Sequence, residues 1–303
     1  MEKISVIIPF YKGNEHLSKI KKMIEVNSDM LQGYATTEMI IVNDSPWVDV
    51  NFDNICSDKY ELKIVKHKKN SGIHQARVSG ILESKGDYVY MLDQDDEISR
   101  DCLLSLLSMF DDNTEVVFGN GKFEVSEKSK LVFDNYSKAM AARNGNYYLY
   151  LGNLLSSPGQ CLIKKSAIPD FWKKNIMKTN CSDDLFLWVQ LMKKKKVKFC
   201  NRVVYLHKNT GQNVSLDKRN GYLSDEEVLK ILKKNNLCKK NSLIVFELRC
   251  KRNLSKYCSN KMNRTFFNGI YDLFEIIIKL KIKIFSYVYF LFGKQIDKSF
   301  MLR

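Results

Sequence analysis

The sequence has few prolines, no paired cysteine motif and no obvious linker. Only 4 of its 303 residues are proline, and no internal repeat or Pro- or Gly-rich stretch separates parts of the chain. The 8 cysteines form no C-x-x-C pair and lie mostly in apolar or mixed segments. This pattern is typical of reduced, structural cysteines in a cytosolic protein and argues against a zinc site. The amino terminus, MEKISVIIPFY, holds no apolar segment long enough for a secretory signal, so we expect a cytoplasmic location.

Positive charge is in excess. Lys and Arg number 49 against 34 Asp and Glu, which gives a formal net charge of +15. Such an excess favours an anionic partner, and anionic lipid, nucleic acid and diphosphate substrates are the candidates. No helix-turn-helix, RNP or zinc-finger spacing supports nucleic-acid binding. The length suits one large domain with an appendage, or two small domains.

The first half of the chain alternates β-branched segments with segments of helical periodicity, such as Leu17, Ile20 and Ile24. The expected strands are Ile4–Pro9, Met39–Asn43, Leu62–Lys66, Tyr88–Asp93 and Val116–Gly119. This alternation predicts an α/β fold with a mostly parallel central sheet flanked by helices. In such sheets, ligands bind at the carboxyl ends of the strands.

The second half is expected to change from mixed to helical structure. The stretch from Lys122 to Leu155 is rich in Tyr, Asn, Gly and Ser and predicts an irregular loop region. Further strands are expected at Gln160–Lys164 and Lys198–His207, and helices at Asp183–Lys194, Asp225–Lys234, Leu243–Lys256 and Phe266–Phe292. We therefore predict a catalytic domain over residues 1–215 and a helical carboxy-terminal region over residues 216–303.

Acidic side chains follow two of the expected strands. Asp44 comes after the run MIIV, and Asp93-Gln94-Asp95-Asp96 comes after YVYML. Unpaired carboxylates are too costly for a protein core. If the segment is extended, Asp93 and Asp95 point to the same side, where they repel unless a cation lies between them. Oxygen ligands of this kind suit Mn²⁺ or Mg²⁺, which also bind phosphate oxygens.

The segments ISVIIPFY, EMIIVNDS, NSGIHQARVSGILESKGDYVYMLDQDD and SDDLFLWVQL occur in this order. Together they resemble glycosyltransferase family 2, an inverting family with the GT-A fold that includes bacterial envelope polysaccharide enzymes. A D-x-D triplet alone is common, but four ordered motifs over roughly the first 215 residues are specific. The resemblance implies that Pro9 and Tyr11 border the donor base and that Asp44 accepts a hydrogen bond from it. It also implies that Arg77 helps position the donor diphosphate or the acidic loop, and that Asp93 contacts the donor ribose or a metal-bound water.

The same resemblance implies a metal ligand and a catalytic base. Asp95 matches the direct ligand of Mn²⁺ or Mg²⁺, and Asp184 matches the second acid of the family's Glu-Asp pair, the general base. His207 is a further candidate metal contact, although the family's Y-R-x-H stretch appears here without its arginine and with shifted spacing. Each residue also has an ordinary structural explanation: Asp44 in an Asx turn, Asp184 at a helix amino terminus, and Tyr11 as a packed aromatic.

The implied function is transfer of one sugar from a nucleotide-diphosphate sugar, commonly a UDP-sugar, to a hydroxyl of a glycan or lipid-linked acceptor in cell-surface polysaccharide or lipopolysaccharide assembly. A sugar nucleotidyltransferase would carry a Gly-rich, basic loop after the first strand, which VIIPFYKGNEH is not. A processive synthase would carry Q-x-x-R-W, whereas residues 212–215 read QNVS. A catalytically silent nucleotide-sugar or carbohydrate-binding module stays an alternative.

The segment from Leu273 to Gly293 is apolar and aromatic but contains Glu275, Lys279, Lys281 and Lys283. Those charges disfavour a spanning helix, since each costs roughly 2.5–3.5 kcal/mol near the bilayer centre. The pattern predicts a helix at an anionic membrane surface, which would place the protein at the inner face of the plasma membrane. A core helix or an oligomer contact is the alternative, and the sequence leaves the oligomeric state open.

Overall fold

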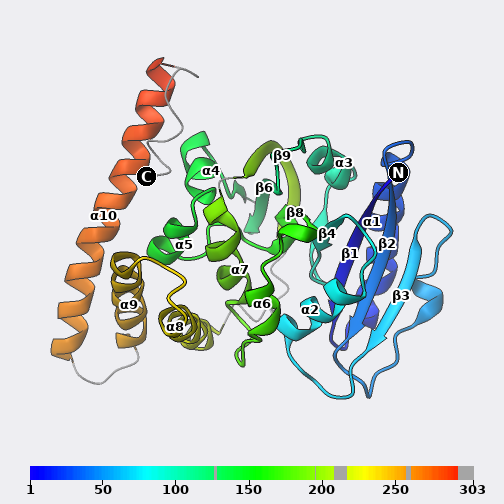
Figure 1. Ribbon diagram of the computed structural model, residues 1–303, viewed down its shortest axis with the longest axis horizontal. Coiled ribbons are helices and arrows are strands. Elements are labelled where there is room, and N and C mark those ends of the chain that lie inside the picture. Colours follow the sequence, from blue (N-terminus) through cyan, green and yellow to red (C-terminus); the bar gives the residue numbers. More distant parts are fainter. Residues whose placement is uncertain (126–127, 195, 208–216, 257–260, 293–303) are drawn as a thin grey trace. The chain divides into compact units, whose positions relative to one another are not determined.

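The computed structural model describes residues 1–125, 128–194, 196–207, 217–256 and 261–292 (Figure 1). Two compact units interleave along the chain. The first comprises Met1–Val132, Leu155–Lys178 and Lys196–Gln212, and the second comprises Phe133–Leu154, Thr179–Lys195 and Asn213–Arg303. The sequence QNVS and the predicted boundary after residue 215 lie at residues outside the described ranges, so that boundary stays a prediction.

The first unit is built on one sheet. Its strands are β1 (Glu2–Phe10), β2 (Ala35–Asn43), β3 (Glu61–Lys66), β4 (Tyr88–Met91), β5 (Glu97–Ile98), β6 (Val116–Val125), β7 (Lys128–Leu131), β8 (Cys161–Lys164) and β9 (Val197–His207). Their order is β3-β2-β1-β4-β8-β6-β9-β5, with β7 paired to β6. Strands β1 to β4 are mutually parallel and β9 is parallel to β6, while β8, β5 and β7 pair antiparallel with their neighbours. The predicted α/β fold is therefore confirmed, with parallel pairing among the first four strands and mixed pairing in the rest of the sheet.

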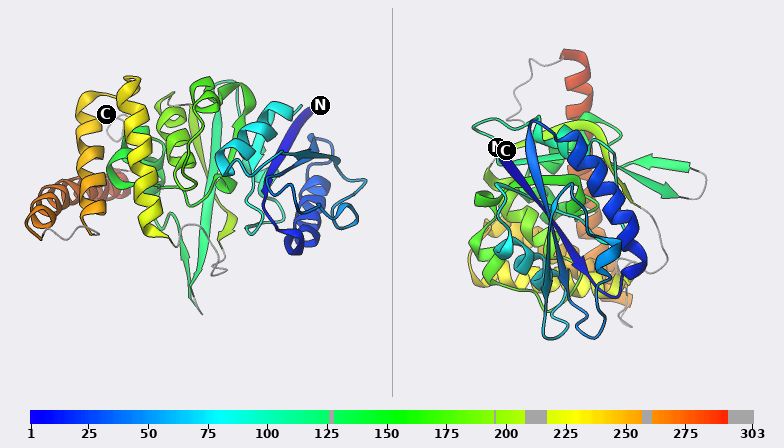
Figure 2. Two further views of the ribbon diagram at one scale, coloured as in Figure 1. Left: turned by 90° about the horizontal axis from the view of Figure 1, so that it is seen from below. Right: turned by 90° about the vertical axis from the view of Figure 1, so that its right-hand side faces the viewer.

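Helices cover both faces of this sheet. The helices of the unit are α1 (Leu17–Met30), α2 (Ile73–Glu83), α3 (Cys102–Leu107) and the short α6 (Asp170–Lys174). Alternate residues of β1, including Ile4, Val6 and Ile8, share a buried cluster with apolar residues of α1 and α3. Ile7 points the other way, toward Gly80 of α2. The right-hand view of Figure 2 shows α1 and α2 on opposite sides of the strands.

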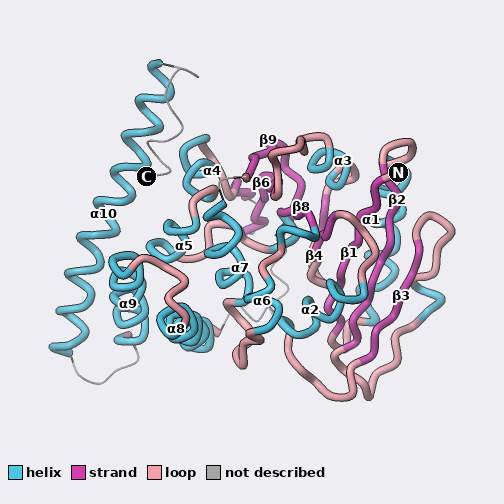
Figure 3. The backbone as a smooth tube through the Cα atoms, viewed as in Figure 1, coloured by secondary structure: helices cyan, strands magenta, loops and turns pink. Residues whose placement is uncertain are grey.

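The second unit is helical in its described residues. It contains α4 (Tyr136–Ala142), α5 (Gly145–Leu151), α7 (Asp183–Leu191), α8 (Lys218–Lys234), α9 (Lys240–Ser255) and α10 (Lys261–Phe292), drawn in cyan in Figure 3. Among the described residues of both units, no helix combines the length and the apolar character needed to cross a membrane.

The expectation of an irregular loop region from Lys122 to Leu155 is wrong, because this stretch holds the β6–β7 pairing and two short helices. Two asparagines of this stretch, which its composition would assign to a loop, instead cap the two helices. The side chain of Asn135 accepts a hydrogen bond from the backbone of Lys138 (3.1 Å), and that of Asn144 accepts one from the backbone of Asn146 (3.0 Å). Asn is favoured at helix amino termini for this reason.

Candidate active site

The carboxyl ends of β1, β2 and β3 are tied together by backbone hydrogen bonds just beyond the ladder. The N–H of Asp44 donates to the carbonyl of Phe10 (2.9 Å), and that of His67 donates to the carbonyl of Asn43 (3.0 Å). The N–H of Leu92, after β4, donates in the same way to Ile7 (2.9 Å). Because parallel strands end at one edge of a sheet, the segments that follow them meet there.

Gln94 clamps the segment after β1 to the acidic turn after β4. Its side-chain oxygen accepts from the backbone N–H of Tyr11 (2.9 Å), and its side-chain N–H₂ donates to the carbonyl of Tyr11 (3.1 Å). Gly13 lies against the same amide, so that a Cβ there would come within 2.4 Å of the Gln94 oxygen. The backbone N–H of Lys12, at a φ of 53°, donates to the hydroxyl of Ser45 (3.0 Å) after β2.

Two exposed aromatic side chains stand beside this clamp. The rings of Tyr11 and Trp47 meet edge to face with centroids 6.2 Å apart, and the ammonium of Lys12 lies 5.3 Å and 5.8 Å from the two centroids. Tyr11 is 44% exposed and Trp47 is 60% exposed. Exposed aromatic rings next to a cation can border a planar base and its phosphates.

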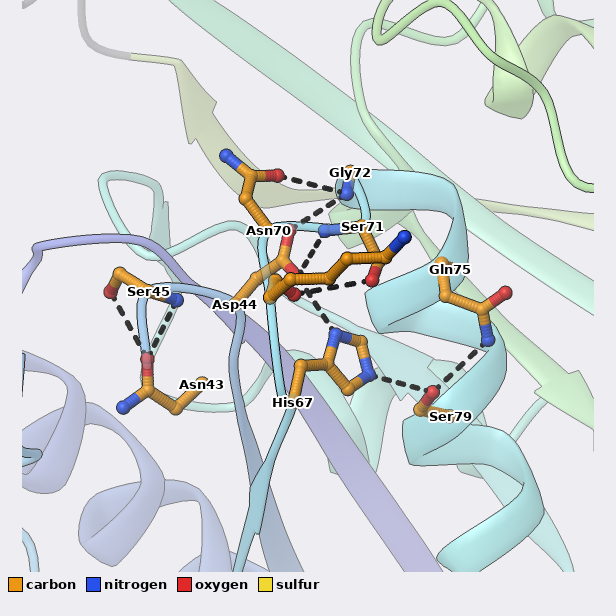
Figure 4. A network of polar contacts seen from close by, with 10 residues as sticks. Asn43, Asp44, Ser45, His67, Asn70, Ser71, Gly72, Gln75 and Ser79 are labelled. Carbon is orange, nitrogen blue, oxygen red and sulfur yellow. Dashed lines mark hydrogen bonds and ion pairs between the residues drawn. The ribbon is translucent and has the colours of Figure 1, made fainter. Parts of the chain in front are cut away.

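Asp44 is almost fully buried and organises the loop between β3 and α2 (Figure 4). One of its oxygens accepts from the Nδ1 of His67 (2.7 Å) and from the backbone of Ser71 (2.7 Å), and the other accepts from the backbone of Gly72 (2.8 Å). His67 also contacts the hydroxyl of Ser79 through Nε2 (2.9 Å). A carboxylate has about four acceptor sites. Three are used here, so capacity for one further donor remains.

The acidic segment forms a turn rather than an extended strand end. Strand β4 stops at Met91, and the backbone N–H of Asp96 donates to the carbonyl of Asp93 (3.1 Å). The expected strand end at Asp93 is therefore wrong, and strand alternation does not decide where Asp93 and Asp95 point. Tertiary contacts decide it for Asp93, whose carboxylate accepts from the buried guanidinium of Arg77 (2.6 Å).

Asp96 lies at the buried end of this turn. The hydroxyl of Ser157 donates to its carboxylate (3.1 Å), and the Nδ1 of His207 lies 3.9 Å from its other oxygen. His207 also contacts the hydroxyl of Tyr205 (3.3 Å). Burial raises the pKa of the Asp96 carboxyl well above its usual range, and the charges of Asp93 and Asp95 raise it further. The turn is thus a place where negative charge is crowded.

This crowding fits a divalent cation, which would relieve the repulsion between the carboxylates. A carboxylate such as that of Asp95 is a ligand that Mn²⁺ and Mg²⁺ accept, and His207 lies beside the same turn, next to Asp96. Within the described ranges no three His, Cys, Asp or Glu side chains form a complete metal cage. A Mg²⁺-type site with one or two carboxylates leaves positions for substrate phosphates. The assignment of Asp95 and His207 as ligands stays a prediction.

Asp184 belongs to the second unit, in the first turn of α7. One of its oxygens accepts from the side-chain amide of Asn153 (2.5 Å), and the other accepts from the backbone of Leu185 (2.6 Å). The preceding Ser182 donates its hydroxyl to Asp225 of α8 (2.9 Å). These contacts fix the start of α7 and hold a half-buried carboxylate in one orientation. Its role as general base stays a prediction.

Comparison with known families decides the identity of the chain. The sequence profile of Glycosyl transferase family 2 matches residues 5–172, which include Tyr11, Asp44, Arg77 and the acidic turn. The chain belongs to glycosyltransferase family 2. This family member has the mixed α/β architecture of GT-A transferases, as solved structures of the same fold show.

One relative and two solved structures show what kinds of protein the chain resembles. Poly(ribitol-phosphate) β-N-acetylglucosaminyltransferase TarP of Staphylococcus aureus is 28% identical over 64% of this chain and 59% of its own length. The structure of S. aureus TarS 1–349 with UDP-GlcNAc matches with a TM-score of 0.55 at 12% identity, covering 89% of this chain and 80% of that one. The mannosyltransferase PcManGT of Pyrobaculum calidifontis, in complex with GDP-Man and Mn²⁺, matches with a TM-score of 0.52 at 12% identity, covering 97% and 88%.

The matched regions span only 31%, 21% and 42% of the length of the first curated relatives. The comparisons therefore establish the family of the chain, while its activity, donor, acceptor and pathway are matters for proposal.

The structure brings most of the predicted donor-side residues to one edge of the first unit. It also shows residues there whose roles were not predicted from the sequence, notably Gln94, Trp47, Tyr205 and His67. For two of these residues the sequence holds a clue to a role at the site. Gln94 lies inside the D-Q-D-D segment, and Tyr205 precedes His207 by two residues on one strand. The contact of Gln94 with Tyr11 joins residues 83 positions apart, and nothing local predicts it.

Proposed function

We propose that this glycosyltransferase moves a single sugar, with inversion, from a nucleotide-diphosphate sugar to a hydroxyl of a glycan or lipid-linked acceptor in cell-surface polysaccharide assembly. The observation that carries this proposal is one edge of the first unit, which holds an exposed aromatic pair, the buried carboxylate of Asp44 and a crowded acidic turn. Gln94 joins Tyr11 to this turn, and Arg77 pairs with Asp93 within it. The UDP-GlcNAc in TarS 1–349 favours a UDP-sugar as the first donor to test, and the name of TarP favours an envelope polymer as acceptor.

On the donor side, each residue has a distinct task in this proposal. Tyr11 and Trp47 border the base, and the remaining acceptor site of Asp44 takes a hydrogen bond from its edge. Arg77 holds Asp93 in place, so that the acidic turn keeps its shape when the diphosphate arrives. Asp95 and His207 would hold Mn²⁺ or Mg²⁺, which when bound supplies several kcal/mol of charge stabilisation to the leaving diphosphate.

On the acceptor side, Asp184 removes the proton of the attacking hydroxyl. The new bond forms between that oxygen and C1 of the sugar, while the bond from C1 to the phosphate oxygen breaks on the opposite face. The nucleoside diphosphate leaves with the electron pair, and the proton stays on Asp184. A positioned carboxylate contributes typically about 10²–10⁴-fold to such a transfer. Asn153 and the backbone of Leu185 orient the carboxylate for this task.

The test is a panel of nucleotide sugars, with and without Mn²⁺, scored for nucleoside diphosphate release. With the active donor, Asp95→Ala should remove the metal-dependent rate, and Asp184→Asn should lower kcat by about 10²–10⁴-fold while leaving donor affinity intact. The exposed Asp112→Ala and Asp53→Asn are the matched controls and should behave as the parent chain. Transfer at the normal rate by Asp184→Asn would show that another group is the base.

A further inference from the structure

Helix α10 is apolar on two sides, and the described residues of the second unit cover one of them. On the covered side, Phe285 joins a buried cluster with Met140 and Tyr147, against which Ile278 and Ile282 pack. A hydrogen bond from the hydroxyl of Tyr271 to the carbonyl of Tyr150 fixes the same side. This face accounts for the anchoring of α10 to the helices before it.

The other side is an exposed apolar stripe, with exposed fractions from 41% at Ile270 to 67% at Tyr287. Its members are Ile270, Leu273, Ile276, Ile277, Leu280, Ile284 and Tyr287. With 3.6 residues per turn, spacings of three and four residues place all of them along one face of the helix. Apolar residues exposed singly are ordinary, but a continuous stripe of this length marks an interaction surface.

Lysines border the stripe on both edges. By the same helical geometry, Lys279 and Lys283 lie along one edge and Lys281 along the other. The acids of this part of α10 are neutralised within the second unit, because Glu275 pairs with Lys279 (2.5 Å) and Asp272 pairs with Arg252 (3.0 Å). The outer face of α10 is therefore apolar along its middle, with the positive charges of Lys281 and Lys283 on its two margins, while Lys279 balances Glu275.

We propose that the apolar stripe of α10 docks onto the surface of an anionic lipid bilayer, with the helix lying parallel to the membrane plane. A helix with this arrangement buries its apolar stripe at the boundary between headgroups and acyl chains, while lysine stems extend toward the lipid phosphates. Each lysine near an anionic surface strengthens the attraction. The net charge of +15 acts in the same direction.

A second copy of the chain suits this face less well. In a symmetric contact between two stripes, the same patch meets itself. The clustered lysines of both copies would then approach one another, and like charges across an interface oppose association. A bilayer of anionic lipid offers the opposite charge along both edges at once, so the arrangement of charge favours lipid.

The proposal is independent of the sugar chemistry and can be tested without any donor. The full chain is mixed with vesicles of phosphatidylcholine alone, or of phosphatidylcholine with phosphatidylglycerol, and bound protein is measured by flotation at rising salt. We expect binding to the anionic vesicles and a loss of binding as salt screens the lysines.

Two variants separate the contribution of the apolar stripe to vesicle binding from that of the lysines. Leu273→Glu with Leu280→Glu changes only exposed positions and should lower vesicle partitioning by at least about tenfold. Lys281→Gln and Lys283→Gln together should lower it by about 25-fold, since each charge is worth about fivefold. The matched controls are Leu223→Glu with Ile244→Glu, and Lys230→Gln with Lys234→Gln, all at exposed positions of α8 and α9.

Absence of vesicle binding would overturn the proposal, as would equal binding to neutral and anionic vesicles or an equal loss in the controls. Concentration-dependent dimerisation that the Leu273 and Leu280 changes abolish, seen by sedimentation velocity without vesicle binding, would assign the stripe to a second copy instead. Nucleoside diphosphate release from a water-soluble donor should be unchanged in the leucine and lysine variants, so a failure of membrane binding is distinguishable from a failure of the glycosyltransferase assignment.

Discussion

Gln94 joins two strand ends with one side-chain amide. This amide donates one hydrogen bond to the backbone of Tyr11 and accepts another from it, and Gly13 leaves room for the Gln94 side chain. The side chain carries no charge, so it can stand between Asp93 and Asp95 without adding to their repulsion. We therefore regard Gln94 as a positioning residue that connects the aromatic pair to the acidic turn.

The change Gln94→Met tests this role, since it keeps the length of the side chain and removes both hydrogen bonds. Each bond contributes about 0.5–1.5 kcal/mol, so the KM for the donor should rise about tenfold while kcat changes less. The measurement is nucleoside diphosphate release at varied donor concentration. Gln32→Met, at an exposed position, is the control, and an unchanged KM in Gln94→Met would contradict the clamp.

Among the elements of the first unit, α2 carries Arg77 and packs closely on the sheet through Gly80. A Cβ on Gly80 would lie 2.3 Å from the Cγ2 of Ile7, a core residue of β1. Close approach of the helix to the strand therefore depends on the missing side chain. Since Arg77 and Gly80 share this helix, the packing at Gly80 also sets how far the guanidinium reaches toward Asp93.

The pair Gly80→Ala and Gly221→Ala should change stability in opposite directions. At Gly80 the added methyl overpacks the core, which costs typically about 1–3 kcal/mol. At Gly221 in α8 nothing lies within 4 Å of the new Cβ, and alanine should stabilise by roughly 0.4–1 kcal/mol. Urea unfolding of both variants measures this, and equal shifts would refute the packing argument.

In the second unit, Arg249 links three helices. Its buried guanidinium donates to the carboxylate of Asp225 (2.6 Å) and to the carbonyls of Tyr148 (2.6 Å) and Leu149 (3.1 Å). Asp225 in turn accepts from Ser182 at the start of α7. The position of the Asp184 carboxylate therefore depends on a contact made by α9.

Replacing this arginine should be far more damaging than replacing its exposed neighbour. Arg249→Met leaves the partly buried Asp225 carboxylate without its main partner, which costs up to about 3 kcal/mol. Arg252→Met breaks a more exposed pair with Asp272, which contributes about 1 kcal/mol or less. Thermal unfolding compares the two variants, and a similar loss in both would show that Arg249 has no special structural role.

At the scale of the whole molecule, binding of donor and metal should increase the free energy of unfolding. Anything that binds only the folded chain stabilises it, by about 2.7 kcal/mol at a concentration of 100 times its Kd. UDP with Mn²⁺ should therefore raise the midpoint of thermal unfolding by several degrees, and more than UDP with a chelator. Asp95→Ala should lose the part of the shift that depends on Mn²⁺. A shift identical with chelator and with Mn²⁺ would argue against a metal that bridges protein and diphosphate.

Much of the fold follows from local patterns in the sequence. The starts of β4 and β6 and the ends of β2, β3 and β9 lie where the β-branched segments predict them, because strand periodicity and the residues that break it act over a few neighbours. The same locality explains the wrong prediction of a loop between Lys122 and Leu155. Asparagine is common in loops, but here it caps helices. Composition alone does not distinguish the two, since the cap depends on where the next turn begins.

The sequence by itself determined that acidic and aromatic residues follow the strands of a parallel sheet, and it predicts a nucleotide site at that edge. Only the tertiary structure decided which partner each of these residues meets: Arg77 for Asp93, His67 for Asp44, Gln94 for Tyr11. The reason is physical. Strand and helix patterns arise from neighbours a few residues apart, whereas a hydrogen bond between residues 16 to 83 positions apart exists only once the sheet has brought their segments together.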